Sequence, residues 1–205
     1  YPKCWRCDSS LLFIAVPQWF FRVSAIREKL IEENKKVNWF PSFASDNFES
    51  WLTSLSDWPI SRQRYWGIPL PIWECEKCSA VRVVGSSEEL NIQIEDLHRP
   101  YIDEVRLKCN CGGVMKRIPD VLDVWFDSGV ASWASIGFPK NTKTFEEKWP
   151  ADLNIEGPDQ FRGWWNSQII TSMITFGKTP FRNVVLHGKV LDLKGAKMSK
   201  SRGNV

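Results

Sequence analysis

The spacing of the cysteines constrains the fold of this chain more than any other feature. The six cysteines fall in three close pairs: Cys4 and Cys7, Cys75 and Cys78, and Cys109 and Cys111. Residues only two or three positions apart rarely form a disulfide with each other, whereas two such pairs on separate loops can hold one tetrahedral zinc ion. We therefore predict that the second and third pairs bind one structural zinc, because four thiolate ligands leave no position open for catalysis.

The first pair and one histidine leave alternatives open. Cys4 and Cys7 supply two ligands without a local partner, so either a second knuckle lies outside this chain or the pair binds no metal. His98 lies between the two zinc knuckles and could replace a thiolate, although a surface position is the simpler interpretation.

The composition is that of an ordinary globular domain. Of the 205 residues, 43% are hydrophobic and 25% are charged, and the net charge of +3 permits an anionic partner without requiring one. No apolar run approaches the roughly 18 residues of a membrane-spanning helix, and no signal-peptide pattern is present. The chain opens at Tyr1 inside what reads as a motif, so we expect an internal piece of a longer protein.

Hydrophobic periodicity predicts an α/β fold. Helices are predicted at 19–34, 48–55 and 159–177, an extended segment at 68–73, and strands at 121–126, 151–157 and 183–192. The last strand–helix–strand unit implies a right-handed crossover and a parallel sheet. Gly177 ends its helix, as glycine commonly does.

Ligands of such sheets bind beyond the carboxyl ends of the strands. The predicted ends carry three clusters: Trp125-Phe126-Asp127-Ser128-Gly129, Glu156-Gly157-Pro158-Asp159-Gln160, and His187-Gly188. Several of the twelve tryptophans stand beside Gly, Arg or Asp, where an indole more often lines a pocket than packs in a core. We expect the three clusters to border one crevice.

The stretch "KGAKMSKSRGNV" at 194–205 combines lysines, serines and glycines. Glycines let the backbone approach a ligand, hydroxyl groups donate hydrogen bonds, and ammonium groups neutralise phosphate oxygens. A mobile basic loop of this kind suits a triphosphate. The alternative is a solvated, lysine-rich tail.

Four motifs in this order resemble those of class I aminoacyl-tRNA synthetases, and among them the isoleucine-specific branch. They are "DWPISRQRYWGIPLPIW" at 57–73, "VLDVWFDSG" at 121–129, "NIEGPDQFRGWW" at 154–165 and "KMSKS" at 197–201. "YPKCWRCDSSLLF" and "PQWFFRV", near the start, resemble the family's return from its inserted editing domain into the catalytic core. The valine branch shares "SRQRYWG" and "KMSKS", and the leucine branch departs further.

The resemblance implies roles for individual residues. Six would bind the aminoacyl-adenylate: Glu156, Gly157, Asp159, Gln160, Trp125 and Trp164. Among these, Asp159 and Gln160 would hold the ammonium group and the ribose side, while the two tryptophans would wall the aliphatic pocket. Core packing is the alternative for each tryptophan.

The resemblance also assigns the terminal loop to ATP. Four residues would bind it: Lys197, Ser199, Lys200 and Ser201. Lys197 and Lys200 would act catalytically on the leaving phosphates. Arg62 and Arg64 are further candidates, with ordering of the neighbouring backbone as the alternative for both. Mg²⁺ should accompany the ATP, held by phosphate oxygens and water.

The resemblance implies the second half of a Rossmann-like catalytic domain with an inserted zinc ribbon. Residues 1–72 would return from an editing domain, 73–116 form the ribbon, and 117–205 complete the sheet up to the loop. The partners would be ATP, L-isoleucine and tRNA(Ile) of a full-length, monomeric, cytoplasmic enzyme without membrane contacts. The piece alone should be inactive, because the family's His-x-Gly-His motif is absent. The alternatives are a valyl- or leucyl-type synthetase, or a non-catalytic zinc-stabilised module that binds nucleic acid.

Overall fold

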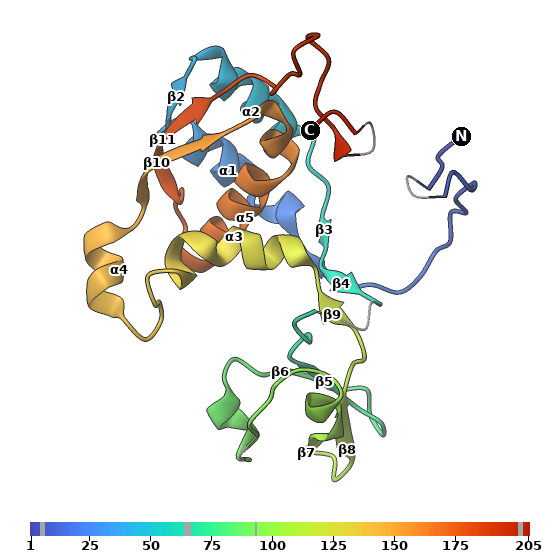
Figure 1. Ribbon diagram of the computed structural model, residues 1–205. Coiled ribbons are helices and arrows are strands. Elements are labelled where there is room, and N and C mark those ends of the chain that lie inside the picture. Colours follow the sequence, from blue (N-terminus) through green and yellow to red (C-terminus); the bar gives the residue numbers. More distant parts are fainter. Residues whose placement is uncertain (5–6, 64–66, 93, 201–202) are drawn as a thin grey trace.

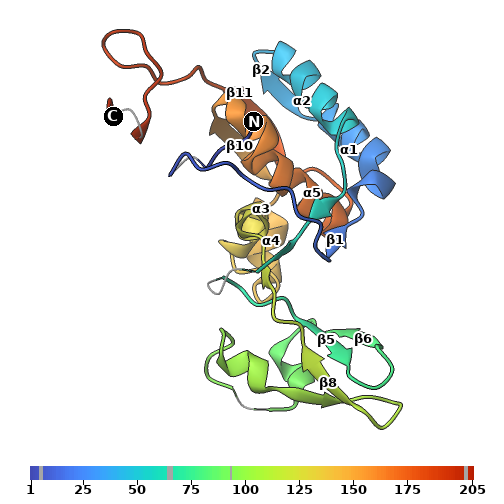
Figure 2. The same ribbon diagram turned by 90° about the vertical axis from the view of Figure 1, so that its right-hand side faces the viewer.

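The computed structural model describes residues 1–4, 7–63, 67–92, 94–200 and 203–205. Two residues singled out above, Arg64 and Ser201, lie outside these ranges. The chain forms an α/β part and a smaller antiparallel ribbon, joined by a narrow stem (Figure 1). A second view shows the ribbon projecting from the end of the α/β part near α3, Val124–Ala134 (Figure 2). Among the described residues, no helix has both the length and the apolar character needed to cross a membrane.

A three-stranded parallel sheet organises the α/β part. Its central strand, β11 (Phe181–Leu186), pairs with β10 (Ala151–Glu156) on one side and with β2 (Asn38–Phe40) on the other. The 3-10 helix η4 (Pro158–Arg162) and helix α5 (Trp164–Phe176) connect β10 to β11. The predicted α/β class and its parallel strand–helix–strand unit are confirmed. β2 escapes prediction because three residues are too few to show a period.

Helices cover one face of this sheet. α1 (Arg27–Asn34), α2 (Phe43–Thr53) and α5 enclose a core of large buried side chains. The ring of Trp39, on β2, lies 5.3 Å from that of Phe48 and 5.2 Å from that of Trp165. Both indole N–H groups donate to asparagine side chains, so the core holds these tryptophans without an unpaired polar group.

The opposite face of the sheet is not covered by any element that the structure describes. Phe40, Leu153 and Ile155 point to that side and are 56%, 53% and 53% exposed. Alternate residues of a strand face opposite sides of a sheet, which explains why Trp39 and Asn154, beside them in the chain, are buried. The sheet is therefore one layer short of the arrangement in which both faces of a parallel sheet are covered.

A second pair of helices packs beside α5. α3 lies along it at close range, because a Cβ on Gly129 would lie only 2.8 Å from the carbonyl oxygen of Ser167. α4 (Thr142–Lys148) and its flanks then close an aromatic cluster against the end of α5. Its rings belong to Trp133, Phe138, Phe145, Trp149 and Phe176.

The ribbon is a four-stranded antiparallel sheet in the order β6-β5-β8-β7. Its elements are β5 (Ile72–Cys75), β6 (Val81–Val83), the 3-10 helices η2 (Ser87–Leu90) and η3 (Tyr101–Glu104), β7 (Arg106–Lys108) and β8 (Val114–Arg117). A core of its own surrounds Trp73, which is 1% exposed and donates its Nε1–H to the carbonyl of Val105. The extended segment predicted at 68–73 does lead into this ribbon.

The stem consists of two short antiparallel pairs. β1 (Phe20–Phe21) pairs with β3 (Trp58–Pro59), and β4 (Ser61–Arg62) pairs with β9 (Val121–Leu122). The first pair also corrects a prediction. The helix expected from Trp19 begins only at Val23, as the 3-10 helix η1 (Val23–Ile26), because the preceding phenylalanines pair as a strand.

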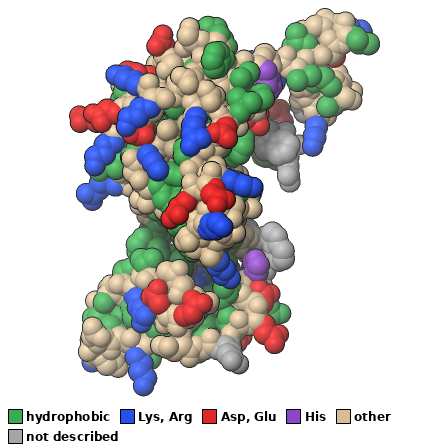
Figure 3. All heavy atoms as spheres, turned by 90° about the vertical axis from the view of Figure 1, so that its left-hand side faces the viewer, with side chains coloured by type: hydrophobic (Ala, Val, Ile, Leu, Met, Phe, Trp, Pro, Cys, Tyr) green, Lys and Arg blue, Asp and Glu red, His purple; other side chains and the backbone are tan. Residues whose placement is uncertain are grey.

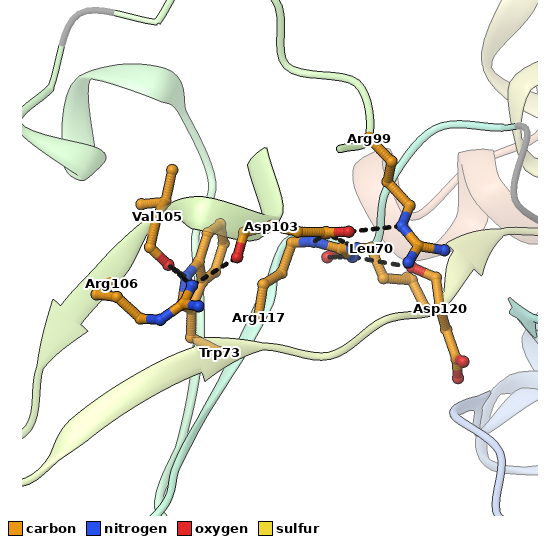
Figure 4. A network of polar contacts seen from close by, with 8 residues as sticks. All are labelled: Leu70, Trp73, Arg99, Asp103, Val105, Arg106, Arg117 and Asp120. Atoms are coloured by element: carbon orange, nitrogen blue, oxygen red, sulfur yellow. Dashed lines mark hydrogen bonds and ion pairs between the residues drawn. The ribbon is translucent and has the colours of Figure 1, made fainter. Parts of the chain in front are cut away.

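One arginine fixes the ribbon to the stem (Figure 4). Arg117 donates to the carbonyl of Leu70, where the chain enters the ribbon, and to that of Asp120, where it leaves, at 3.1 and 2.9 Å. It also donates to Asp103, which accepts a further bond from Arg99 at 2.7 Å. Burial alone would raise the pKa of Asp103, but these two arginines outweigh it and lower the pKa. The carboxylate therefore stays ionised and holds the guanidinium in place.

The strand predicted over 121–126 is wrong beyond Leu122. The side chain of Asp123 accepts a hydrogen bond from the N–H of Trp125 and so caps the start of α3. An aspartate in this position stabilises the first turn of a helix. Trp125 consequently lies on a helix rather than at the end of a strand.

Candidate functional site

The four cysteines of the ribbon converge at one point. Their Sγ atoms all lie within 4.8 Å of one another. The Cys75 and Cys111 sulfurs are 3.5 Å apart, and those of Cys78 and Cys109 are 3.6 Å apart. Four thiolates at about 2.3 Å from a tetrahedral zinc are about 3.8 Å from one another. The sulfur set therefore fits a structural metal ion with little adjustment.

Two tight turns present these sulfurs. In the first, the N–H of Ser79 donates to the carbonyl of Cys75, and the N–H of Cys75 donates to that of Ala80, both at 2.9 Å. In the second, the N–H of Cys109 donates to the carbonyl of Gly113 at 2.9 Å. A Cβ on Gly113 would lie 2.9 Å from the sulfur of Cys75, so a larger residue would push the knuckles apart.

The thiols of this cluster ionise unequally. The N–H of Lys77, 3.4 Å from the sulfur of Cys75, is the main cause that lowers the pKa of that thiol to about 6. The N–H of Gly113 would lower the pKa of Cys111, but the thiols of Cys78 and Cys75 outweigh it and raise the pKa to about 12. A divalent cation bound to all four sulfurs would offset the repulsion between thiolates.

The other candidate ligands lie apart from this cluster. His98 is exposed, and its Nδ1 lies 2.7 Å from a carboxylate oxygen of Asp96. Cys4 and Cys7 belong to the N-terminal loop, where the Cys7 sulfur lies 3.0 Å from the hydroxyl of Ser9. Both alternatives for that pair therefore stand.

The carboxyl ends of β10 and β11 lie side by side. Glu156 is in register with Leu186, and the N–H of His187 donates to the Glu156 carbonyl at 3.0 Å. A Cβ on Gly157 would lie 3.3 Å from the His187 ring and 3.2 Å from the carboxylate of Asp159. The two predicted clusters at these strand ends are thus brought together, and the glycine allows their close approach.

Gln160 and Trp164 continue this edge. The Oε1 atom of Gln160 accepts the N–H of Trp164 at 2.6 Å, where α5 begins, and its Nε2 lies 3.4 Å from the exposed carboxylate of Asp159. The Trp164 Nε1–H donates to the carbonyl of Ser128 at 2.8 Å, which holds the ring against α3. Both side chains are therefore fixed before any ligand binds.

Trp125 reaches the same place from α3. A Cβ on Gly163 would lie 3.2 Å from the Trp125 ring and 2.4 Å from the Gln160 Oε1 atom, so these three residues are in contact. Trp125 is 42% exposed, whereas Trp165, one residue past Trp164, is fully buried. Trp125 is therefore partly open to solvent, whereas Trp165 belongs to the core.

Asp123 fixes the start of α3 and was not singled out in the sequence. It is 3% exposed and, besides capping α3, accepts bonds from Trp58 at 2.8 Å and from Arg62 at 2.7 Å. Burial, together with the charge of Asp123, raises the pKa of Asp127 on the next turn. An aspartate directly before an apolar helical run is the signal that identifies such a cap.

The loop after β11 starts from the same edge of the sheet. The strand predicted over 183–192 ends at Leu186, and the chain then folds back on itself. Leu191 forms a bridge with Lys197, and the N–H of Met198 donates to the carbonyl of Val190 at 3.2 Å. The terminal stretch is therefore a hairpin rather than an unstructured tail.

The hairpin displays the predicted phosphate-binding residues unequally. Lys197 and Lys200 are exposed, Ser199 is half-buried, and Ser201 lies outside the described residues. Because the hairpin follows β11 in the chain, it starts from the end of the sheet that carries Glu156 and His187.

An apolar cavity of about 710 Å³ lies elsewhere, where the ribbon meets the α/β part. Leu70, Leu122 and Phe126 are among the residues that line it, and Figure 3 shows hydrophobic side chains at this junction. Phe126 lines the cavity whereas Trp125 contacts Gly163, so consecutive residues of α3 face different sites. We assign the candidate active site to the carboxyl end of the sheet instead, because aromatic side chains and convergent polar groups meet there.

Comparison with known proteins identifies the family. A family model described as tRNA synthetases class I (I, L, M and V) matches residues 8–205. An isoleucine–tRNA ligase of Methanothrix thermoacetophila is 52% identical over 210 residues, which cover 100% of this chain and 20% of that protein. One of Archaeoglobus fulgidus is 53% identical over 207 residues, again 100% of this chain and 20% of that protein.

A solved structure agrees with these relatives. It is the ternary complex of Agrobacterium radiobacter LeuRS with tRNA and LeuAMS, with a TM-score of 0.54 and 30% identity, and covers 74% of this chain and 21% of that one. The chain spans about one fifth of the length of the curated relatives named above. Because the family model covers residues 8–205 and the relatives match the whole chain at more than 50% identity, the chain belongs to the class I tRNA synthetases of the I, L, M and V group.

Proposed function

We propose that this chain supplies the second half of the catalytic domain of an isoleucine–tRNA ligase. That enzyme activates isoleucine with ATP to isoleucyl-adenylate and transfers the isoleucyl group to tRNA(Ile). The observation that carries the proposal is the meeting of the Glu156–Gln160 cluster, Trp125 and the start of the lysine loop at one end of the sheet. The identity of the relatives, 52% and 53%, supports isoleucine over other amino acids.

This end of the sheet suits an aminoacyl-adenylate. Trp125 and Trp164 offer flat apolar surfaces to an aliphatic side chain. The exposed carboxylate of Asp159 suits the ammonium group, because hydrogen bonds between charged groups are the strong ones. Gln160 already uses its oxygen on the N–H of Trp164, so its Nε2–H group is the part that remains to donate to the ribose side. Glu156 accepts hydrogen bonds beside Gly157, where the backbone can approach closely.

The chemistry needs no protein nucleophile. The isoleucine carboxylate attacks the α-phosphorus of ATP, the bond from that phosphorus to the bridging oxygen breaks, and pyrophosphate leaves with the bonding electrons. Catalysis then depends on positioning and on neutralising the charge that grows on the leaving group. Lys200, with Lys197, supplies positive charge there, while Ser199 and Ser201 fix the loop. When Mg²⁺ is bound with ATP, it neutralises phosphate oxygens.

The remaining assignments follow from the same proposal. The ribbon metal is Zn²⁺, because four thiolates in a tetrahedral set suit it. Residues 1–72 connect to an editing domain, 73–116 form the ribbon insertion, and 117–205 complete the catalytic sheet. The partners are ATP, L-isoleucine and tRNA(Ile), and the enzyme acts as a monomer in the cytoplasm without membrane contacts.

Amino-acid-dependent exchange of pyrophosphate into ATP tests the proposal. In a full-length synthetase that carries these residues, Lys200→Ala should lower the exchange rate about 10²–10³-fold, with a much smaller change in the Michaelis constant for ATP. Lys194→Ala, at the exposed hairpin tip, is the matched control and should keep the rate.

The amino-acid dependence of the same assay decides the substrate. Exchange that depends on isoleucine supports the proposal. Exchange that depends on leucine or valine would assign the chain to another branch of the family, and a normal rate in Lys200→Ala would remove the role of the loop. The chain by itself should exchange almost nothing.

A further inference from the structure

We propose that Asp192 and Asn204 form a clamp that holds the lysine loop in its phosphate-binding shape. The proposal rests on the function proposed above and assigns two positioning residues to it. Asp192 stands near the start of the hairpin and Asn204 near its end. Asn204 donates from Nδ2 to the Asp192 Oδ2 atom at 2.7 Å. The two side chains therefore close the loop that carries Lys197 and Lys200.

Each member of the clamp also holds backbone groups inside the loop. The Asp192 Oδ1 atom accepts the N–H groups of Lys194 and Ala196, both at 2.9 Å. The Asn204 Oδ1 atom accepts the N–H of Ser199 at 2.9 Å, and its Nδ2 lies 3.3 Å from the carbonyl of Lys197. The backbone on both sides of the first lysine is thus set by these two side chains.

The chemistry of the clamp suits an aspartate opposite an asparagine. The hydrogen bond from Asn204 is the main cause that lowers the pKa of Asp192, and the N–H of Ala196 adds to it. The carboxylate is therefore an ionised acceptor of three donors, and hydrogen bonds to charged groups are stronger than neutral ones. Asp192 and Asn204 are both half-buried, whereas Leu193 and Lys194 between them are exposed.

A preorganised loop matters for catalysis in this family of reactions. If no protein group reacts covalently, the rate depends on how closely the ammonium groups already match the charge of the departing pyrophosphate. A loop that fluctuates would have to become ordered in the transition state. The clamp makes that ordering part of the folded protein, so its loss should lower kcat more than it weakens ATP binding.

A reciprocal exchange of the two side chains tests the clamp. In Asp192→Asn, an amide replaces the carboxylate, so an NH2 group must face either Asn204 or the two backbone N–H groups. In Asn204→Asp, two carboxylates face each other. In the double variant the amide of residue 192 donates to the carboxylate of residue 204. The bond between the two side chains is thus restored with reversed direction, while the N–H groups of Lys194, Ala196 and Ser199 donate to oxygens as before. Only the 3.3 Å contact to the carbonyl of Lys197 is lost.

Amide hydrogen exchange in the zinc-loaded chain reads out the clamp directly. Protection at Ala196 and Ser199 should fall at least tenfold in each single variant and return in the double variant. Protection at Ile169, in the buried core, should not change in any of them. Leu193→Ala, at the fully exposed tip, should leave all of these amides as they are.

Kinetics of a full-length synthetase carrying the same substitutions then test the role. Each single variant should lower kcat for adenylate formation about 10–100-fold, the range expected for losing charge-assisted hydrogen bonds. The double variant should recover most of it, with the Michaelis constant for ATP little altered throughout. Single variants with normal protection at Ala196 and Ser199 would overturn the clamp. Lost protection with an unchanged kcat would show that the clamp has no role in catalysis. Absent activity in the unmodified enzyme would refute the proposed function, but it would not contradict the Asp192–Asn204 clamp as a structural feature.

Discussion

Cys4 and Cys75 each begin a Cys-x-x-Cys motif that is closed by the same pair of backbone hydrogen bonds. The N–H of Asp8 donates to the Cys4 carbonyl at 2.8 Å, as that of Ser79 does to the Cys75 carbonyl at 2.9 Å. Asp8 and Ser79 both have positive φ, 56° and 53°. In each loop the N–H of the first cysteine also donates to the carbonyl five residues on, at 2.8 and 2.9 Å.

The surroundings of the two loops differ. Cys75 is 1% exposed, packs against the ribbon core and faces Cys111. Cys7 is exposed, and its loop is closed by the exposed ion pair of Lys3 and Asp8. The comparison teaches that local sequence suffices to form a knuckle. A four-thiolate site needs a second knuckle, which only tertiary structure can deliver.

The largest effect, on zinc content, should come from removing one thiolate of the four-cysteine site in the ribbon. Cys75→Ser should reduce the zinc content of the chain from about one equivalent to near zero, because zinc binding and the folding of such small domains are coupled. Amide protection of Trp73 and Met115, in the ribbon core, should disappear with the metal. Cys4→Ser, the same change in the matching loop, should leave both measurements unchanged. A full equivalent of zinc in a Cys75→Ser/Cys109→Ser double variant would show that the metal binds elsewhere.

A smaller effect should come from loosening the ribbon around the knuckle. Arg117→Met removes the buried guanidinium, so the carbonyls of Leu70 and Asp120 lose this donor and Asp103 loses one partner. The carbonyl of Asp120 keeps the N–H of Leu70, at 3.2 Å. Breaking a buried pair costs about 3–5 kcal/mol, and since the Asp103 side chain is 28% exposed we expect about 2–3 kcal/mol. Competition with a chelator in urea measures this loss as earlier release of zinc.

The control for that experiment is an exposed ion pair. Arg182 and Asp152 are 56% and 82% exposed, so Arg182→Met should cost less than about 1 kcal/mol. Equal effects of the two substitutions would mean that the stem does not stabilise the ribbon. Reactivity of Cys4 and Cys7 should be the same in both variants, since their loop shares no contact with Arg117 among the residues described.

The sequence predicts those structural features that depend on residues close to one another in the chain. The cysteine spacing predicts the ribbon cluster, and the apolar period over 159–177 predicts a helix that indeed ends at Gly177, whose φ is 70°. Asp123 shows where such a prediction fails. Its side chain accepts a hydrogen bond from the N–H of Trp125, so a helix begins where the sequence predicts a strand. The Asp192–Asn204 bond joins residues twelve apart without any periodic signal, so only the folded hairpin reveals it. The roles of Glu156, Asp159 and the loop lysines stay predictions, since the structure places these residues without showing what they bind.

The smallest expected effect is on the reactivity of Cys7, in the N-terminal Cys4–Cys7 loop. The hydroxyl of Ser9, 3.0 Å from the Cys7 sulfur, is the main cause that lowers the pKa of that thiol. A lowered pKa means that more of the thiol is thiolate at neutral pH, and the thiolate is the form that reacts. In the zinc-loaded chain, alkylation of Cys7 should therefore begin at a lower pH than for an ordinary cysteine. Ser9→Ala should move the alkylation profile to higher pH and slow the reaction several-fold at pH 7, as followed by peptide mass spectrometry. An unchanged profile would mean that the hydroxyl of Ser9 does not contact the Cys7 sulfur in solution. The two loops would then resemble each other only in the spacing of their cysteines.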